Sequence, residues 1–433
     1  MHKNKSLIFL VTLIVFLLLG AVSLGRIEVA KVDAASNYQE LQLFTDVLTI
    51  VQRSYVEEVS IKDLVYGAIE GMLASLDPHS GFMSPEIYKE MKVDTRGEFG
   101  GLGIEISQRD GVLTIVSPIE DTPASRAGLK SGDHILKIED EYTKDMEIME
   151  AVQLMRGAPG TKITITIMRP DFEKPQAFTL EREVIKVQSV KSKTLESGFG
   201  YVRLAQFQER SGDDLAKALE QLRHENGGSL QGLVLDLRNN PGGLLDQAVE
   251  VADTFLAQGL IVYTQGREAD AQMEFSAVQR GTEPDYPMVV LINGGSASAS
   301  EIVAGALQDH GRAVIMGVQS FGKGSVQTII PLSDDSGLRL TTAKYYTPNG
   351  TSIQARGIVP DIEVQQSEIK EVQEFDHFRE KDLKNHFNTE SNADQSAHAE
   401  ATSLDEETRK DFQLMRALDL LKGWRIFQGL KAA

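Results

Sequence analysis

Three serines lie close together in the run Gly294-Gly-Ser-Ala-Ser-Ala-Ser-Glu301. This run follows the apolar segment Met288–Ile292 and opens an apolar-periodic segment that ends at Gly311. A strand, a tight turn of small residues and a helix would expose hydroxyl groups beside helix-start amides, which stabilise a developing oxyanion. A serine before a helix is more often a cap, so the turn alone is weak evidence for a nucleophile. The pattern predicts a nucleophile only if a base can be found.

Histidine is a poor candidate for that base. Only His310 of the eight histidines lies in this region, at the far end of the same helix. Twelve helical residues would separate it from Ser298 by about 18 Å, too far for proton transfer. Lysine can serve where burial among apolar groups lowers its pKa and makes a neutral amine available. Lys323, flanked by glycines between two apolar strands, is the natural candidate.

The segment around Lys323 also matches two other motifs. Gly317–Gly324 nearly fits the phosphate-binding loop, but Gly324 replaces the hydroxyl that would hold magnesium, and residues 326–330 read as a strand instead of a helix. Ser320-Phe-Gly-Lys323 fits S-x-x-K, but Gly322 and the following strand disfavour the required helical turn. We therefore expect neither nucleotide binding nor a Ser320 nucleophile.

Composition and the first segment restrict partners and compartment. Across 433 residues, 44 Lys+Arg and 63 Asp+Glu give a net charge of −19, which disfavours nucleic acid. The absence of cysteine excludes disulfides, thiolate metal sites and Cys nucleophiles. Residues 6–25 carry no charge and follow Lys3 and Lys5, which predicts export with the basic end in the cytoplasm. A retained anchor and a cleaved signal are both open.

The hydrophobic pattern divides the chain into five parts. Residues 1–35 form the signal or anchor, and 36–95 read as helical. Residues 96–183 are β-rich and have the size of one small domain. Residues 184–366 alternate strands with helices, which indicates an α/β core, and 367–433 form a polar linker with a final helix.

The final helix is expected near residues 411–421. Its apolar face is predicted to carry Phe412, Met415, Leu418 and Leu421. This face and the apolar faces of the helical region 36–95 are compatible with a homodimer or with packing on the chain's own core.

Several ordered motifs resemble those of the carboxyl-terminal processing peptidases, also called tail-specific proteases. The resemblance runs from about Tyr38 to Val364 through Leu76-Asp-Pro-His-Ser80, Gly100-Gly-Leu-Gly103, Asp236-Leu-Arg-Asn-Asn-Pro-Gly-Gly243, Ser296-Ala-Ser-Ala-Ser-Glu-Ile302 and Phe321-Gly-Lys-Gly-Ser-Val-Gln327. It implies a Ser/Lys serine endopeptidase with a multidomain α/β fold, in which a β-rich PDZ domain is inserted before a crotonase-like core. No metal, nucleotide or other cofactor is implied.

The resemblance also assigns the site residues. Position by position, it places the nucleophile at Ser298, the general base at Lys323 and a lysine-orienting amide at Gln327. The oxyanion donors would be the backbone N–H of Ala299 and that of a glycine, Gly242 or Gly243.

A second site follows from the β-rich region. Gly101-Leu102-Gly103-Ile104 resembles the carboxylate-binding loop of PDZ domains, and residues 124–133 also resemble PDZ sequence. The resemblance implies that the free C-termini of protein or peptide substrates bind there and add as a strand.

Two residues keep alternative interpretations. Asp309 aligns with a functionally important aspartate of some family members, or has a structural role near a helix end. Arg156 either couples the PDZ domain to the core or is a surface arginine. An inactive PDZ adaptor is the rival function, and a regulator that activates the enzyme is a further expected partner.

Overall fold

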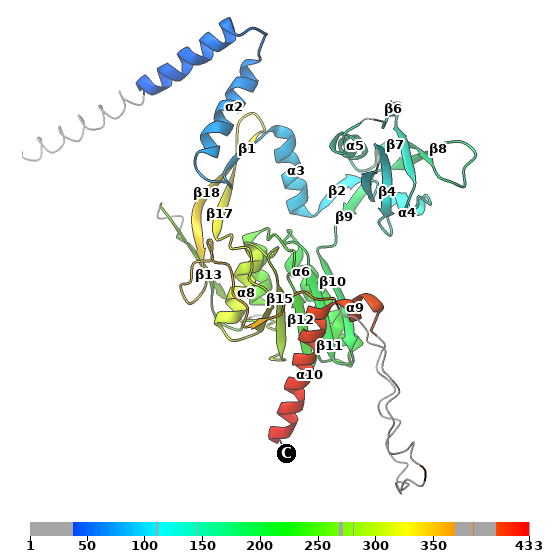
Figure 1. Cartoon of the computed structure of the whole chain (residues 1–433), viewed down its shortest axis with the longest axis vertical. Helices are drawn as coiled ribbons and strands as arrows, with labels where there is room; N and C mark the ends of the chain where they lie inside the picture. The colour runs from blue at the N-terminus through cyan, green and yellow to red at the C-terminus, as the bar shows by residue number, and fades with distance from the viewer. Residues whose placement is uncertain are drawn as a thin grey trace, which may run out of the picture. The chain divides into compact units, whose positions relative to one another are not determined.

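The computed structural model describes residues 38–109, 111–144, 146–267, 272–279, 281–368, 384 and 404–432 (Figure 1). The chain forms two compact units, residues 1–82 and 83–433. The predicted membrane segment 6–25 and residues 369–383 and 385–403 of the predicted linker region lie outside the described residues. Within the described part, no helix has the length and apolar character needed to span a bilayer.

The described part of the first unit is mainly helical. Residues 38–54 form one helix and α2 (Ile61–Ala74) a second. Leu41 and Phe44 on the first helix are exposed, although both are apolar.

The second unit begins with a β-rich domain and its flanking segments. Its elements are α3 (Pro85–Arg96), β2 (Glu98–Gly101), β3 (Ile104–Arg109), β4 (Val112–Pro118), α4 (Pro123–Arg126), β5 (His134–Ile138), β6 (Glu141–Tyr142), α5 (Ile148–Met155), β7 (Lys162–Met168), β8 (Gln176–Glu181) and β9 (Glu183–Lys186), while β1 (Gly81–Met83) lies at the junction of the units. The main sheet has the order β3-β4-β5-β7-β8, with β6 on β5. Ile163, Ile165 and Ile167 on β7 are buried and alternate with less buried residues, because side chains of a strand alternate between its faces.

The remaining elements build the α/β core. They are β10 (Val190–Glu196), β11 (Phe199–Leu204), α6 (Ser211–Glu225), β12 (Gly232–Asp236), α7 (Leu245–Asp253), β13 (Gly259–Gly266), β14 (Glu274–Ala277), β15 (Met288–Ile292), α8 (Ala299–Asp309), β16 (Val314–Gly317), β17 (Ser325–Pro331), β18 (Gly337–Tyr346), β19 (Ile362–Glu363), α9 (Glu406–Lys410) and α10 (Phe412–Ala432).

A six-stranded sheet organises this core. Its order is β10-β11-β12-β15-β16-β19, and all neighbours are parallel except β10 and β11. Since β12, β15 and β16 are parallel neighbours, the loops that follow them emerge at one edge of the sheet. Ligands of open α/β sheets bind at the carboxyl ends of the strands.

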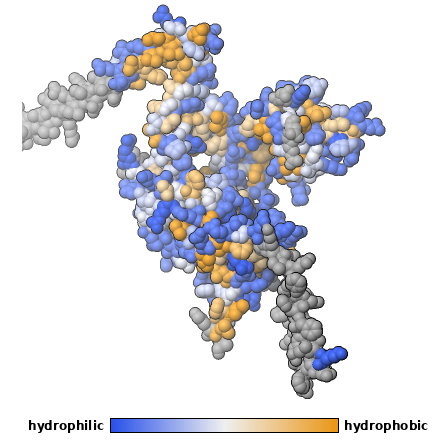
Figure 2. Space-filling view, in the orientation of Figure 1, coloured by the Kyte–Doolittle hydropathy of each residue, from blue (hydrophilic) through white to orange (hydrophobic). Residues whose placement is uncertain are grey.

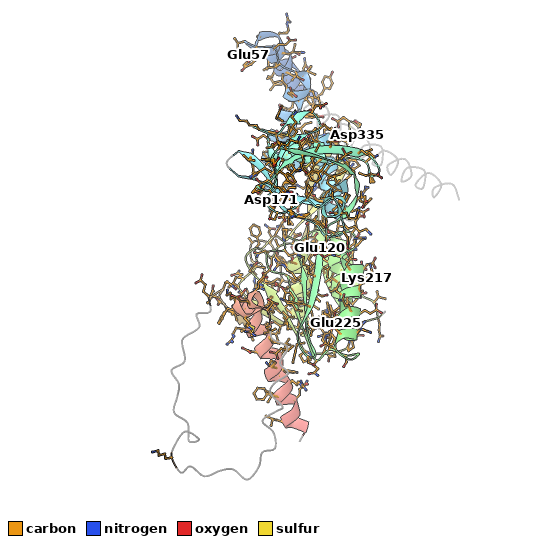
Figure 3. The ribbon with its side chains drawn as sticks, turned by 90° about the vertical axis from the view of Figure 1, so that its right-hand side faces the viewer. Glu57, Glu120, Asp171, Lys217, Glu225 and Asp335 are labelled. Carbon is orange, nitrogen blue, oxygen red and sulfur yellow. The ribbon has the colours of Figure 1, made fainter. Side chains whose placement is uncertain are left out.

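Helices cover both faces of the sheet. Leu233 and Leu235 of β12 join the apolar cluster with α6, α7 and α8, whereas Val234 between them joins the cluster with α10. The amphipathic helix α6 buries Leu222 and exposes Lys217 and Glu225 (Figure 3).

A second sheet follows the loop that carries Lys323. β17 and β18 form an antiparallel hairpin, and β18 pairs with β13, which pairs with β14. Val326, Ala343 and Tyr345 of this sheet belong to the same apolar cluster as α8. The loop is therefore held between two packed elements, β16 and β17.

The C-terminal helix packs mostly through the apolar face expected for it. Its buried face carries Leu414, Ala417, Leu418 and Leu421. Phe412 and Met415, also expected on that face, are half-buried, and Met415 packs against the same apolar cluster. Gln413 is buried beside this face, where its amide oxygen accepts from Arg238 and its amide nitrogen donates to the carbonyl of Val364 at 2.7 Å.

The same helix is longer than its apolar periodicity predicts. It continues to Ala432, and Trp424, Ile426, Phe427 and Leu430 near its end are exposed (Figure 2). These side chains do not continue the buried apolar stripe. The apolar period of the first turns of α10 therefore does not predict burial at its end.

Docking of α10 predicts a large stability difference between two similar substitutions. Leu418→Ala should lower the free energy of unfolding by about 2–5 kcal/mol, because a buried leucine is removed and a cavity is left. Leu430→Ala, on the exposed end of the same helix, should change it by less than about 0.5 kcal/mol. Urea unfolding followed by circular dichroism measures both; equal effects would show that α10 does not pack on the sheet.

Candidate active site

Three loops meet at the carboxyl edge of the six-stranded sheet. The loop after β12 contains Gly242 and Gly243, the turn after β15 contains Ser298, and the loop after β16 contains Lys323. Their strands are neighbours in the order β12-β15-β16, so the topology brings together three motifs that are far apart in the sequence.

Ser298 occupies a strained turn between β15 and α8. Its backbone has φ 54° and ψ −112°, a conformation that is rare for a residue with a side chain. A strained strand-to-helix turn is also how nucleophilic serines are presented in α/β hydrolases. The strain marks Ser298 as the distinctive serine of the turn.

The other serines near the site have structural partners. Ser296 Oγ donates to the carbonyl of Leu237 at 2.7 Å, and Ser300 Oγ donates to that of Asn240 at 2.9 Å. Both side chains are fully buried, whereas Ser298 retains 7% exposure. Ser320 Oγ donates to Glu301 at 2.6 Å, which leaves Ser298 as the candidate nucleophile.

Lys323 and Gln327 are brought together as the motif predicts. The Lys323 amine donates to Gln327 Oε1, and the amide nitrogen of Gln327 donates to Ser325 Oγ at 2.9 Å and to Thr341 Oγ1 at 3.3 Å. These two acceptors orient the amide so that its oxygen faces the amine.

The pKa of Lys323 is lowered from its ordinary value. Burial is the largest cause, because a charged amine loses hydration, and the positive charge of Arg339 adds to it. The carboxylate of Glu301 acts in the opposite direction without reversing the shift. The environment therefore favours the neutral amine that a general base requires.

Glu301 links the serine turn to the lysine loop. Its Oε2 accepts from the backbone N–H of Ser298 at 2.7 Å and from that of Lys323 at 2.9 Å. Its Oε1 accepts from the N–H of Gly322 and the hydroxyl of Ser320, both at 2.6 Å. The residue is fully buried, and one carboxylate thus fixes two loops.

Sequence reasoning did not assign Glu301 this role. The available signal was the S-x-x-E spacing of Ser298 and Glu301, which is typical of a helix capping box. That pattern predicts the bond to Ser298 N–H, but not the three bonds to the segment 320–323.

The structure distinguishes the two glycines considered for the oxyanion site. Gly242 lies against the nucleophile turn: a Cβ on it would be 2.8 Å from Ser298 Cβ and 3.0 Å from Ala299 N. Its own N–H donates to Asn240 Oδ1 at 2.9 Å. Phe207 forms an isolated β-bridge with Gly243 through two bonds of the neighbouring residues. Its N–H donates to the carbonyl of Gly242, and its carbonyl accepts from the N–H of Leu244, so the N–H of Gly243 takes no part.

Ala299 supplies the second candidate donor. It is the first residue of α8, where a backbone N–H has no acceptor within the helix. Ala299 and Gly243 therefore remain the candidate donors for an oxyanion at Ser298.

Asp309 lies at the opposite end of α8. Eleven helical residues separate it from the nucleophile turn by about 16 Å, and its carboxylate accepts from the N–H of Asn349 at 2.9 Å. His310 follows it and donates from Nε2 to the carbonyl of Leu260 at 2.7 Å. Both have structural contacts far from Ser298.

The β-rich domain presents an open sheet edge. β3 is the terminal strand of its sheet and follows the loop Gly101–Gly103 directly. Leu102 is buried, and Gly103 has φ 76°. A glycine-rich turn that leads into an edge strand is the arrangement with which PDZ domains bind an extended peptide.

Arg156 is tied to the segment that precedes this domain. Its guanidinium lies 3.2 Å from the carboxylate of Glu90 on α3 and 4.7 Å from the ring centroid of Phe99. The next residue, Gly157, donates from its N–H to the carbonyl of Gly100 at 3.0 Å.

Comparisons with known proteins agree with this architecture. Three family models match: Peptidase family S41 at residues 198–364, PDZ domain at 100–184, and Activating protease CtpB N-terminal domain at 21–87. A carboxy-terminal-processing protease of Bartonella bacilliformis is 47% identical over 390 residues, which cover 90% of this chain and 89% of that protein.

Two further similarities are more distant. A carboxyl-terminal-processing protease of a Synechocystis species is 40% identical over 325 residues, 73% of this chain and 75% of that protein. The solved photosystem II D1 C-terminal processing protease is 30% identical, with a TM-score of 0.44 over 75% of this chain and 92% of that chain.

The family models and the two curated relatives define a serine peptidase that carries a PDZ domain. The chain belongs to peptidase family S41, the family of the carboxyl-terminal processing proteases. The predicted family, the enzyme class and the mixed α/β fold with a PDZ domain are confirmed.

The role of Glu301 generates a stability prediction. Glu301→Gln should lower the free energy of unfolding by about 2–5 kcal/mol, because an amide nitrogen would face N–H donors and leave two of them unsatisfied. Asp309→Asn is the matched control on the same helix and should cost less than about 1 kcal/mol, since its single bond can persist. Urea unfolding measures both, and a Glu301→Gln chain as stable as the control would refute the role of this carboxylate.

Proposed function

We propose that the chain is an exported endopeptidase in which Ser298 is the nucleophile and Lys323 the general base. The observation that carries the proposal is the shared carboxylate of Glu301, which binds the backbone N–H groups of both residues. The lowered pKa of Lys323 supports the same assignment, because only a neutral amine can accept the serine proton.

The proposed reaction has two halves. Ser298 Oγ attacks the substrate carbonyl while its proton moves to Lys323 Nζ, and the oxyanion receives hydrogen bonds from the N–H groups of Ala299 and Gly243. Lys323 then donates the proton to the leaving amine, and an acyl-enzyme remains on Ser298. The neutral Lys323 then takes a proton from water, which attacks this ester, and Lys323 returns the proton to Ser298 Oγ as the carboxylic acid product leaves. Gln327 is proposed to hold the amine in position.

The PDZ domain is proposed to select the substrate. A free C-terminal carboxylate would bind the N–H groups of Gly101–Ile104, and the peptide would add along the open edge of β3. The relatives named carboxy-terminal-processing proteases support this substrate class.

Arg156 is proposed to couple the PDZ domain to the core. It binds Glu90 on α3, and the end of α3 contacts the core where the carbonyl of Thr95 accepts from Glu209 N–H at 3.1 Å. Glu209 lies two residues after Phe207, which bonds Gly242. Peptide binding at Gly101–Ile104, next to the bond between Gly100 and Gly157, would in this way affect the oxyanion loop.

Localisation and partners rest mainly on the sequence. The uncharged segment 6–25 supports export to the extracytoplasmic side of a bacterial-type envelope, either as an anchor or as a cleaved signal. Exposed apolar residues such as Leu41 and Phe427 support a homodimer. The match to the Activating protease CtpB N-terminal domain model supports regulation by an activating partner.

The nucleophile assignment predicts that Ser298→Ala abolishes cleavage and retains peptide binding. The full chain and the variant are incubated with an unfolded protein that has an apolar C-terminus, and cleavage is read by mass spectrometry. Activity should fall by at least about 10³-fold, because no covalent intermediate can form. Ser296→Ala is the control for the neighbouring hydroxyl. Cleavage by Ser298→Ala would move the nucleophile to another serine. Binding without cleavage by the unaltered chain would favour an adaptor or an enzyme that needs its activating partner.

The base assignment predicts that kcat/KM rises with pH as Lys323 loses its proton. Because burial and Arg339 lower the pKa of Lys323, the midpoint should lie below the ordinary lysine value. Arg339→Gln removes one nearby positive charge, raises this pKa and should shift the midpoint to higher pH. Lys344→Gln removes an exposed charge from the same strand and should leave it unchanged. An ionisation near pH 6.5 that neither variant moves would point to histidine.

A further inference from the structure

A buried cluster of charges joins the C-terminal segment to the strand that precedes the oxyanion loop. Asp236 ends β12, Arg238 follows it, and Asp411 directly precedes α10. Asp236 is fully buried, Arg238 retains 6% exposure, and the side chain of Asp411 is 24% exposed. Charges removed from water in this way persist only when they are paired and hydrogen-bonded.

Every N–H of the Arg238 guanidinium has an acceptor in this cluster. Asp236 accepts from Nε at 2.9 Å and from one terminal nitrogen at 2.7 Å. Asp411 accepts from both terminal nitrogens, at 2.9 and 2.6 Å, and Gln413 Oε1 accepts at 3.0 Å. An arginine has five such donors, so its position is fully determined.

Asp411 also fixes the start of α10. Its Oδ1 accepts from the N–H of Leu414 at 3.1 Å, in the manner of a helix cap. Burial is the largest influence and disfavours its charged form, but the hydrogen bonds and charge of Arg238, the N–H of Leu414 and the charge of Arg203 together outweigh burial and lower the pKa of Asp411. The carboxylate is therefore a fixed link between the helix and Arg238.

Arg238 is followed directly by the loop that supports the nucleophile and the oxyanion donors. Asn240 Oδ1 accepts from Gly242 N–H, and its Nδ2 donates to the carbonyl of Leu204 at 2.8 Å. The Asn240 carbonyl accepts from Ala297 N–H at 3.0 Å and from Ser300 Oγ at 2.9 Å. Displacement of Arg238 would thus be transmitted over two residues to both the glycines and the Ser298 turn.

We infer that the C-terminal segment is a positioning element of the active site, and that Asp411 is a positioning residue that sets the oxyanion loop through Arg238. This inference rests on the proposed function of Ser298 and Lys323. Since oxyanion donors act mainly in the transition state, loss of the contact should lower kcat and leave KM little changed.

The test compares two ion pairs that both attach α10 to the core. Asp411→Asn weakens the pair with Arg238, whereas Lys422→Gln removes the pair between Lys422 and Glu196, which is not connected to the loop. Both full chains are assayed for peptide cleavage and for binding of a peptide boronate, whose tetrahedral adduct with Ser298 places an oxygen at the oxyanion position.

Asp411→Asn should lower kcat and boronate affinity at least about 10-fold and change KM by less than about 2-fold. The loss in kcat should stay below the roughly 10²–10³-fold loss caused by removing one oxyanion donor. Lys422→Gln should change each value less than about 2-fold. Asp411→Glu retains the charge and should restore most of kcat. If Asp411→Asn does not fold, Asp411→Glu takes its place in the same assays.

The contrary results are distinct. If Asp411→Asn folds and retains kcat and boronate affinity within about 2-fold, the inference is wrong while the protease function stands. The same holds if Asp411→Asn and Lys422→Gln lose activity equally, because α10 would then act only through stability. If the unaltered chain neither cleaves peptide nor binds the boronate, the proposed function fails, and this inference fails with it.

Discussion

The buried carboxylate of Glu301 is the interaction on which the geometry of the site depends. Its two oxygens accept four hydrogen bonds, from the turn that presents Ser298 and from segment 320–323. Neither loop could hold its shape alone, since the Ser298 backbone is strained and the lysine loop is glycine-rich. The strain at the nucleophile is tolerated because the surrounding bonds determine it.

The same carboxylate creates an electrostatic compromise. A negative charge near Lys323 favours the ammonium form, which would be inactive as a base. Burial and Arg339 act against it and prevail, so the site combines a rigid anionic support with an amine of lowered pKa. The Glu301 oxygens are occupied by backbone and serine donors, whereas the amine itself contacts Gln327.

Local patterns in the sequence predicted much of this arrangement. The alternation of Ile163, Ile165 and Ile167 predicts a strand, and the ordered motifs predict the family and the α/β core with a PDZ domain. The pairing of Lys323 with Gln327 could be expected because both lie in one motif. Glu301 could be recognised as a cap, but its bonds to the lysine loop depend on the adjacency of β15 and β16, which no local pattern contains.

Long-range contacts explain the other differences. Arg238 and Asp411 are 173 residues apart in the chain, and each would read as an ordinary surface charge in isolation. Gln413 takes a buried position on α10 because its amide oxygen accepts from the buried guanidinium of Arg238, a contact that the apolar period of the helix does not contain. A polar side chain thus occupies a buried position of a helix where a buried charged group needs it as a hydrogen-bond partner.

Titration of the Lys323 amine tests the central claim most directly. The ¹³C resonance of its ε carbon is followed by NMR in the full chain and assigned by its loss in Lys323→Met. The account predicts a pKa below that of ordinary lysines, so that the neutral amine is available to Ser298. An ordinary or raised pKa would contradict the account, because the amine would then remain charged and could not take the serine proton.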